Sequence, residues 1–276
     1  MTSARTLSSR TIFYLVLGVT VALSVFPFYW MFVIGSNTTA SVNSFPPTLA
    51  PGSLFIDNLA RAIDRAPFYQ SLINSALIAS AITASVLVLA SLAGFAFAKL
   101  RFPGSGPLFI FVLLTMMVPV QLGVIPLYML MSRMGLVDTL LAVIIPGMIN
   151  AFGVFWMRQY ISGAIPVEIL DAARIDGCGN FAIYWRIVTP TIQPAFATLG
   201  ILTFMQSWND FFWPLIVLQS RDKLTIQLAL RTLNDAYYQD HSMVLAATFV
   251  ATLPLLVAFL LFSRRFIAGL AEGALK

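Results

Sequence analysis

Six long apolar runs, separated by polar segments, dominate the pattern of this chain. The runs cover residues 11–34, 71–98, 107–131, 139–157, 191–218 and 243–263. A helix that crosses a bilayer needs roughly 20 consecutive apolar residues, and each run approaches or exceeds that length. Five of the six runs contain no Asp, Glu, Lys or Arg. The exception is the run 191–218, whose only charged residue is Asp210. The pattern predicts an all-α, polytopic membrane protein with six transmembrane helices in a single domain over residues 1–276.

Composition agrees with the pattern. Only 10% of the 276 residues are charged and 59% are hydrophobic, whereas soluble domains carry about 25% charged residues. The net charge of +5 reflects topology rather than nucleic-acid binding, because the basic residues lie between the apolar runs. The single cysteine, Cys178, excludes an internal disulfide and a cysteine-based metal cluster within this chain. The first run is too long for a signal peptide and predicts a retained span.

The distribution of basic residues predicts the orientation. With a cytoplasmic N-terminus and six spans, ten of the 16 Lys and Arg residues face the cytoplasm, as the positive-inside rule requires. Both termini are then cytoplasmic. Segments 35–70 and 219–242 become external loops, 158–190 a cytoplasmic loop, and 264–276 a cytoplasmic tail.

The 158–190 loop carries signals for two short helices joined at a glycine. Pro166 suits the first turn of a helix, because its missing N–H has no partner to lose there. Glu168 lies where an acid favours the helix dipole. Gly177 is a natural helix stop, after which Asn180 can cap a second helix that Pro190 ends.

Small side chains at Ala172 and Ala173 would allow the first of these helices to approach another surface closely. Two interpretations remain open from the residues alone. The helix could seat in a cleft of a partner protein, or it could lie flat on the lipid headgroups.

The same loop resembles the cytoplasmic EAA motif of ABC importer permeases. Asp171-Ala172-Ala173, Gly177, Ile187 and Pro190 match the spacing of that motif, with Asp171 in place of Glu and Thr189 in place of Leu. In the family this loop docks on an ATPase. The resemblance assigns this contact to Asp171, Ala172, Ala173, Asp176, Gly177, Ile187 and Pro190.

A wider resemblance links the chain to the maltose-type sugar permeases. It rests on Asn74-Ser75, Gly94–Gly104, Met117–Pro119, Ile125–Tyr128, Gly135-Leu136, Trp208-Asn209 and Gly273–Lys276. It implies six spans in the inner membrane, a second related permease, two ATPase subunits that bind ATP and Mg, and an extracytoplasmic sugar-binding protein. In such a complex the tail residues Gly273, Ala274 and Lys276 reach the ATPase. The chain itself would bind no cofactor and no nucleic acid.

Enzymatic chemistry has little support in the sequence. His241 is the only histidine, so neither a Ser-His-Asp set nor a histidine metal site can be built. No P-loop pattern is present. If transport is driven by ATP, a different chain must supply the ATPase.

Asp210 is the strongest candidate for a transport pathway, because an ionisable residue within a span is costly. With Trp208 and Asn209 it could bind sugar hydroxyls in a water-filled cavity, or it could pair with a helix end or a partner subunit. Asn150 is a further pathway candidate or an ordinary interhelical donor. The run 234–241 could touch the substrate or the binding protein, or be a solvated loop.

The expected function is therefore the permease subunit of an ABC importer for a sugar, with an oligosaccharide as the narrower expectation. A permease for substrates of the glycerol-phosphate type is the first alternative. A stand-alone secondary transporter is the second, although such carriers usually hold several polar groups at mid-membrane.

Overall fold

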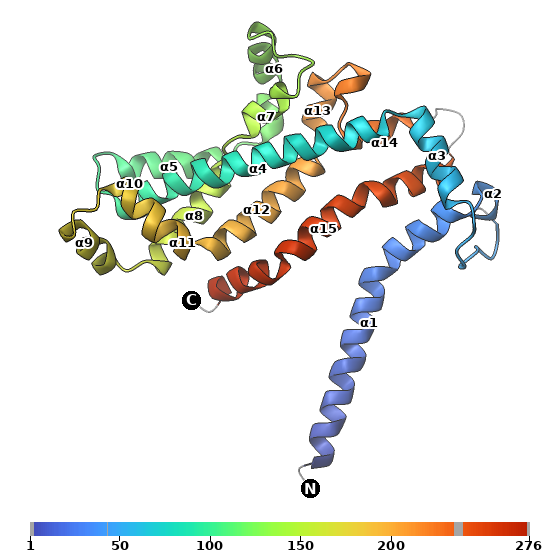
Figure 1. Ribbon diagram of the computed structural model, residues 1–276, viewed down its shortest axis with the longest axis horizontal. Helices are drawn as coiled ribbons and strands as arrows, with labels where there is room; N and C mark the ends of the chain where they lie inside the picture. Colours follow the sequence, from blue (N-terminus) through green and yellow to red (C-terminus); the bar gives the residue numbers. More distant parts are fainter. Residues whose placement is uncertain (1–2, 43, 235–239, 275–276) are drawn as a thin grey trace. The chain divides into compact units, whose positions relative to one another are not determined.

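The structure is a computed structural model that describes residues 3–42, 44–234 and 240–274. Helices and their connections account for all of these residues, without a strand among them. The chain forms two compact units, one of residues 1–68 and 229–253 and one of residues 69–228 and 254–276. The predicted all-α class is confirmed (Figure 1).

The smaller unit joins the N-terminal part of the chain to residues 229–253. Its helices are α1 (Ser3–Ser36), α2 (Thr39–Val42), α3 (Phe55–Arg65), most of α14 (Ile226–Thr232) and the first part of α15 (His241–Ala274). Phe32 lies 5.0 Å from Phe55 and 5.4 Å from Phe249 between ring centroids. A Cβ on Gly35 would lie 2.9 Å from the Ala246 backbone, so glycine lets α1 approach α15 closely.

A buried carboxylate closes this unit. Asp240 is 6% exposed and accepts hydrogen bonds from Arg61 at 2.5 Å, Thr39 Oγ1 at 2.8 Å and the Met243 N–H at 3.1 Å. Burial alone would raise the pKa of Asp240, but these bonds and the charge of Arg61 outweigh it and hold the pKa below its usual value. The predicted loop 35–70 is thus a folded connection that contains α3.

The larger unit is organised along the long helix α4 (Phe68–Lys99). Its other elements are α5 (Ser105–Thr115), η1 (Val120–Gly123), α6 (Val124–Arg133), α7 (Leu141–Gly147), α8 (Ala151–Ala164), α9 (Val167–Ile175), α10 (Asn180–Ile183), the π-helix η2 (Tyr184–Val188), α11 (Thr189–Thr191), α12 (Gln193–Trp208), α13 (Phe212–Val217), η3 (Arg221–Lys223) and the end of α15. A Cβ on Gly94 would lie within 3 Å of Met157 and Arg158 on α8. Small residues therefore let the two helices pack backbone to backbone, as in many membrane bundles.

Four helices are long and apolar enough to cross a bilayer, and two bent pairs raise the number to at most six. One pair joins Ser105–Thr115 to Val120–Arg133 at 93°, and the other joins Asn180–Thr191 to Gln193–Trp208 at 77°. These elements overlap the six predicted runs, except that Asn180–Thr191 lies in the predicted loop 158–190. The count of six and the orientation stay predictions. The predicted fifth run, 191–218, is wrong as one helix, because α12 ends at Trp208 and the chain bends before α13.

Candidate functional site

The helix α9 begins and ends as the sequence predicts. Pro166 precedes its first residue with φ −59°, and Glu168 lies in the first turn. The chain reverses at Gly177, whose φ of +80° is in the left-handed region that favours glycine. The N–H of Gly177 donates to the Arg174 carbonyl, and the next N–H reaches the Ala173 carbonyl at 2.9 Å. These bonds close the helix end as in a Schellman turn.

The second part of the loop differs from the prediction at two positions. Asn180 does not cap it: Gly179 occupies the cap position and Asn180 is the first helical residue, without a side-chain cap hydrogen bond. Pro190 does not end it either, since it lies within α11 and the bend comes at Ile192. Proline is tolerated there because a first helical turn needs no N–H from it.

The two alanines of the motif face opposite environments. Ala173 is 8% exposed and packs in the core beside Leu170, which is 1% exposed. Ala172, by contrast, is exposed. Only Ala172 is thus free to meet another protein, and the prediction that both alanines serve an approaching surface is wrong for Ala173. Its small size instead lets α9 approach its own chain.

The charged and hydrophobic positions of the motif divide in the same way. Asp171 is exposed and pairs with Arg174 at 2.8 Å, and Asp176 is exposed as well. Ile187 is half-buried against the core, whereas Pro190 is exposed.

Two contacts that the sequence did not suggest fix the loop to α4. Lys99 Nζ donates to the carbonyls of Ile165 at 2.6 Å and Ser162 at 3.2 Å, where α8 ends. The hydroxyls of Tyr184 and Ser91 share a buried hydrogen bond of 2.7 Å. Both ends of the loop are thus held by one long helix, and α12 follows the loop closely in the chain. Figure 1 shows α9 and α10 at the end of this unit where α4 finishes.

Large apolar side chains remain exposed around the Gly177 turn. Ile175 is 88% exposed, Phe181 71% and Trp185 48%, and the last two rings lie 6.1 Å apart. Exposed groups of this kind mark interaction sites. We call these three residues the apolar rim of the loop. All three lie outside the positions of the EAA-like motif, so the motif gives no signal for them.

The pathway candidates at the end of α12 are engaged in local structure. Trp208 is 2% exposed and stacks on Phe204. Asn209 is exposed, donates to the Met205 carbonyl and receives a bond from Gln227. Asp210 lies in the break between α12 and α13, and its N–H donates to the Ser207 carbonyl at 3.4 Å. The three residues thus belong to the end of α12, and a pathway role for the Asp210 carboxylate stays a prediction.

Asn150 has a structural partner too. Its side chain caps α8 by accepting a 2.6 Å hydrogen bond from the Gly153 N–H. It therefore sits in the break between α7 and α8 and satisfies the start of α8. This bond lies within one helix and Asn150 accepts it, so it differs from the interhelical donor that the sequence suggested, and a pathway role for Asn150 stays a prediction.

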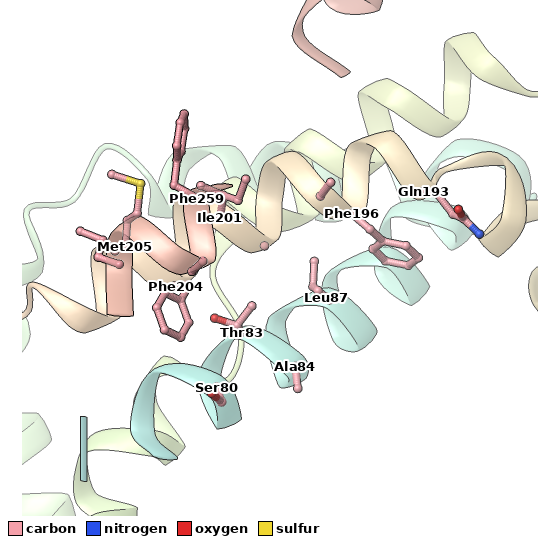
Figure 2. A pocket seen from close by; sticks show the side chains of 14 residues that line it. Ser80, Thr83, Ala84, Leu87, Gln193, Phe196, Ile201, Phe204, Met205 and Phe259 are labelled. Atoms are coloured by element: carbon pink, nitrogen blue, oxygen red, sulfur yellow. The ribbon is translucent and has the colours of Figure 1, made fainter. Parts of the chain in front are cut away.

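A groove that the sequence did not reveal runs between α4, α12 and the end of α15. Its volume is about 480 Å³, and none of its lining residues is charged. Figure 2 shows Thr83 and Phe204 on facing helices, with Gln193 at the far end. The Thr83 hydroxyl is buried without a hydrogen-bond partner in the described chain. Trp208, Asn209, Asp210 and Asn150 do not line it.

Some predicted positions cannot be compared. Gly273 and Ala274 end the described part of α15, whereas Lys276 lies outside the described residues, as does most of the run 234–241. Among the residues described, no three His, Cys, Asp or Glu side chains gather as a metal site would require.

Comparisons with known proteins give the class. Residues 86–267 match the family model described as the binding-protein-dependent transport system inner membrane component. The lactose transport system permease protein LacG of Rhizobium radiobacter is 37% identical over 276 residues, all of both chains. The arabinooligosaccharides transport system permease protein AraQ of Halalkalibacterium halodurans is 37% identical over 227 residues, 82% of this chain and 81% of that one.

Two further likenesses bear on substrate and fold. The sn-glycerol-3-phosphate transport system permease protein UgpE of Yersinia enterocolitica is 30% identical over 261 residues, 92% of each chain. A solved chain, from a bacterial ABC transporter involved in the import of the acidic polysaccharide alginate, superposes with a TM-score of 0.81 at 23% identity. It covers 96% of this chain and 98% of that one, and it supports the fold alone.

The chain therefore belongs to the family of binding-protein-dependent transport system inner membrane components. It is an ABC importer permease subunit, a multi-pass protein of the inner membrane and a transport component rather than an enzyme. The resemblance drawn from the EAA-like loop is confirmed.

Proposed function

We propose that this chain is one of two related permeases in an ATP-driven importer that carries a neutral sugar, in the narrower form an oligosaccharide, into the cytoplasm. The relatives named for lactose and arabinooligosaccharides are more similar to it than the relative named for glycerol phosphate. The proposed complex also contains two ATPase subunits, which bind ATP and Mg, and an extracytoplasmic sugar-binding protein.

The observation that carries the mechanism is the 158–190 loop. Its helix α9 leaves the bundle, reverses at Gly177 and exposes the apolar rim, while Lys99 and Tyr184 tie its base to α4. A capped helix with exposed apolar groups suits a cleft in a soluble partner better than headgroups, since its exposed charges are net acidic: Glu168, Asp171 and Asp176 against Arg174. Interfacial helices are typically basic. We assign this loop to the cytoplasm and to the ATPase, with both termini on the same side.

The groove supports a neutral substrate over a phosphate ester. Phosphate recognition relies on Arg or Lys, and the groove lining carries no charged side chain. A phosphate ester would need a basic side chain that the groove lining lacks, whereas a neutral sugar would not.

The test is reconstitution of the complex with its ATPase and binding protein in vesicles. We expect ATP-dependent uptake of a labelled oligosaccharide and none of glycerol 3-phosphate; the reverse preference would overturn the substrate class. A cysteine at Ala172, the exposed motif position, should crosslink to the ATPase, while a cysteine at buried Ala173 serves as the matched control. An active complex without the Ala172 crosslink would contradict the docking assignment.

A further inference from the structure

The connection between α6 and α7 contains an unusual backbone at Asp138. Its φ is +63°, and among the described residues it alone has a positive φ without being glycine. Asp and Asn tolerate this conformation better than other side chains, although glycine would adopt it most freely. An aspartate held there suggests that its side chain has a task.

That side chain joins two distant stretches of the chain. Its Oδ1 accepts hydrogen bonds from the N–H groups of Gln219 and Ser220, each 2.8 Å long, and its Oδ2 accepts from the Ser220 hydroxyl. The Asp138 N–H in turn donates to the Val217 carbonyl at 2.8 Å. The bonds from Ser220 and Gln219, helped by nearby Lys223, hold the pKa of the Asp138 carboxyl below its usual range.

These four bonds close the end of α13. The helix begins just after the break at Asn209–Phe211. Near its start, Trp213 Nε1 donates to the Ala142 carbonyl on α7 at 2.9 Å. It ends at Val217, whose carbonyl accepts from the Asp138 N–H. Thus α13 is fastened to the α6–α7 region near its start and at its end.

The segment after α13 is tied to the start of α4. Asn74 Nδ2 donates to the carbonyls of Asp222 at 2.9 Å and Leu224 at 3.0 Å, and Ser75 Oγ accepts from the Ile226 N–H at 2.8 Å. The 158–190 loop, which we call the coupling loop, instead reaches α4 at Ser91 and Lys99. At 1.5 Å per residue, Ser75 and Ser91 are about 24 Å apart along the helix.

The two ends are also linked by α12. It starts directly after the coupling loop and finishes at Trp208, before the break and α13. Any shift of α12 that starts at the loop therefore reaches the break between α12 and α13. If α13 is held firmly, the shift moves the surrounding helices. If α13 is held loosely, the break absorbs the shift.

We propose that Asp138 is a positioning residue for transport, a carboxylate clamp that holds α13 on the α6–α7 region so that movement of α12 is passed on to the bundle. The clamp makes α6, α7 and α13 move as one piece. Without it, α13 slips and ATP is hydrolysed with less substrate carried. This inference rests on the proposed ATP-driven function and deepens it.

The experiment compares Asp138→Ala, Asp138→Gly and Asp138→Asn in the reconstituted complex, with sugar carried per ATP hydrolysed as the readout. We expect Asp138→Ala to lower this ratio about tenfold, the factor that loss of a hydrogen bond to a charged group corresponds to. Asp138→Asn should restore it, because the amide oxygen still accepts from both N–H groups and the amide NH₂ can donate to the Ser220 hydroxyl.

Asp138→Gly separates side chain from backbone. Glycine adopts φ +63° freely but makes none of the side-chain bonds, so the ratio should stay as low as in Asp138→Ala. A wild-type ratio in Asp138→Gly or in Asp138→Ala would overturn the clamp. If Asp138→Ala does not assemble, Ser220→Ala, which removes one bond and leaves the backbone intact, decides the matter: an unchanged ratio refutes the proposal and a lowered one supports it. Absence of ATP-driven uptake by the wild-type complex would instead refute the proposed function.

Discussion

Substitution of Gly177 tests whether the shape of the coupling loop transmits the ATPase stroke. The residue has φ +80°, and a Cβ built on it would meet no atom of this chain within 4 Å. The penalty of a side chain is therefore conformational rather than steric. A left-handed conformation costs an L-residue about 1–2 kcal/mol, which corresponds to a 5- to 30-fold loss of the competent loop conformation.

The series Gly177→Asn, Gly177→Ala and Gly177→Val should grade this penalty. Asn tolerates the left-handed region, Ala does so poorly, and β-branched Val is a genuine outlier there. We expect uptake to fall in that order while insertion into the membrane stays normal. Asp also tolerates the region, so Gly177→Asp should act mainly by adding a charge beside the apolar rim.

Sugar uptake and binding-protein-stimulated ATPase activity in vesicles are the measurements. Because none of the residues that line the groove belongs to the 158–190 loop, the relative rates for different sugars should stay constant across the series. Wild-type uptake and stimulation in Gly177→Val would refute the reasoning, since a β-branched side chain is a genuine outlier at this φ.

Three further outcomes follow from single contacts. Asp171→Ala should reduce uptake less than Gly177→Val, because Asp171 and its partner Arg174 form an exposed pair worth about 0–1 kcal/mol; an equal loss would show that Asp171 meets the ATPase. Asp240 has a lowered pKa, so its stabilisation is complete above the unfolded pKa of about 3.9 and disappears as pH falls through the lower folded pKa. Thermal unfolding of detergent-purified protein should accordingly lose less stability on acidification in Asp240→Asn than in wild type. Gly94→Ala should destabilise by about 1–3 kcal/mol through overpacking on Met157, seen as a lower unfolding temperature, whereas Gly123→Ala, with open space at its Cβ, serves as the control.

The elements that local signals define were predictable. Apolar runs locate helices because the requirement for internal backbone hydrogen bonding in lipid acts on each segment separately. The same holds for α9, whose limits follow from Pro166 before it and Gly177 after it. The family was also accessible, because the spacing of the EAA-like motif is a property of the linear chain.

Errors arose where tertiary contacts decide. The sequence shows two adjacent alanines, but the packing of α9 beside Leu170 buries one and leaves the other exposed. It shows an apolar run through 191–218, but the chain leaves the helix after Trp208 and starts a second helix at Phe212. A polar residue in a span marks a special place without telling whether its task is transport or helix capping.

The clamp at Asp138 illustrates the limit most clearly. Its partners Gln219 and Ser220 lie 81 and 82 positions further along the chain, and no periodicity or motif connects residues at such a separation. A trace was present in the sequence, since Gly135 followed by Asp138 is a turn signal between two apolar runs. That trace predicts a turn but not a bond. In this permease the residues that shape each helix can be found from the sequence, one segment at a time. The residues proposed to make the helices move together are found only from the structure, in which α13 lies against the α6–α7 connection.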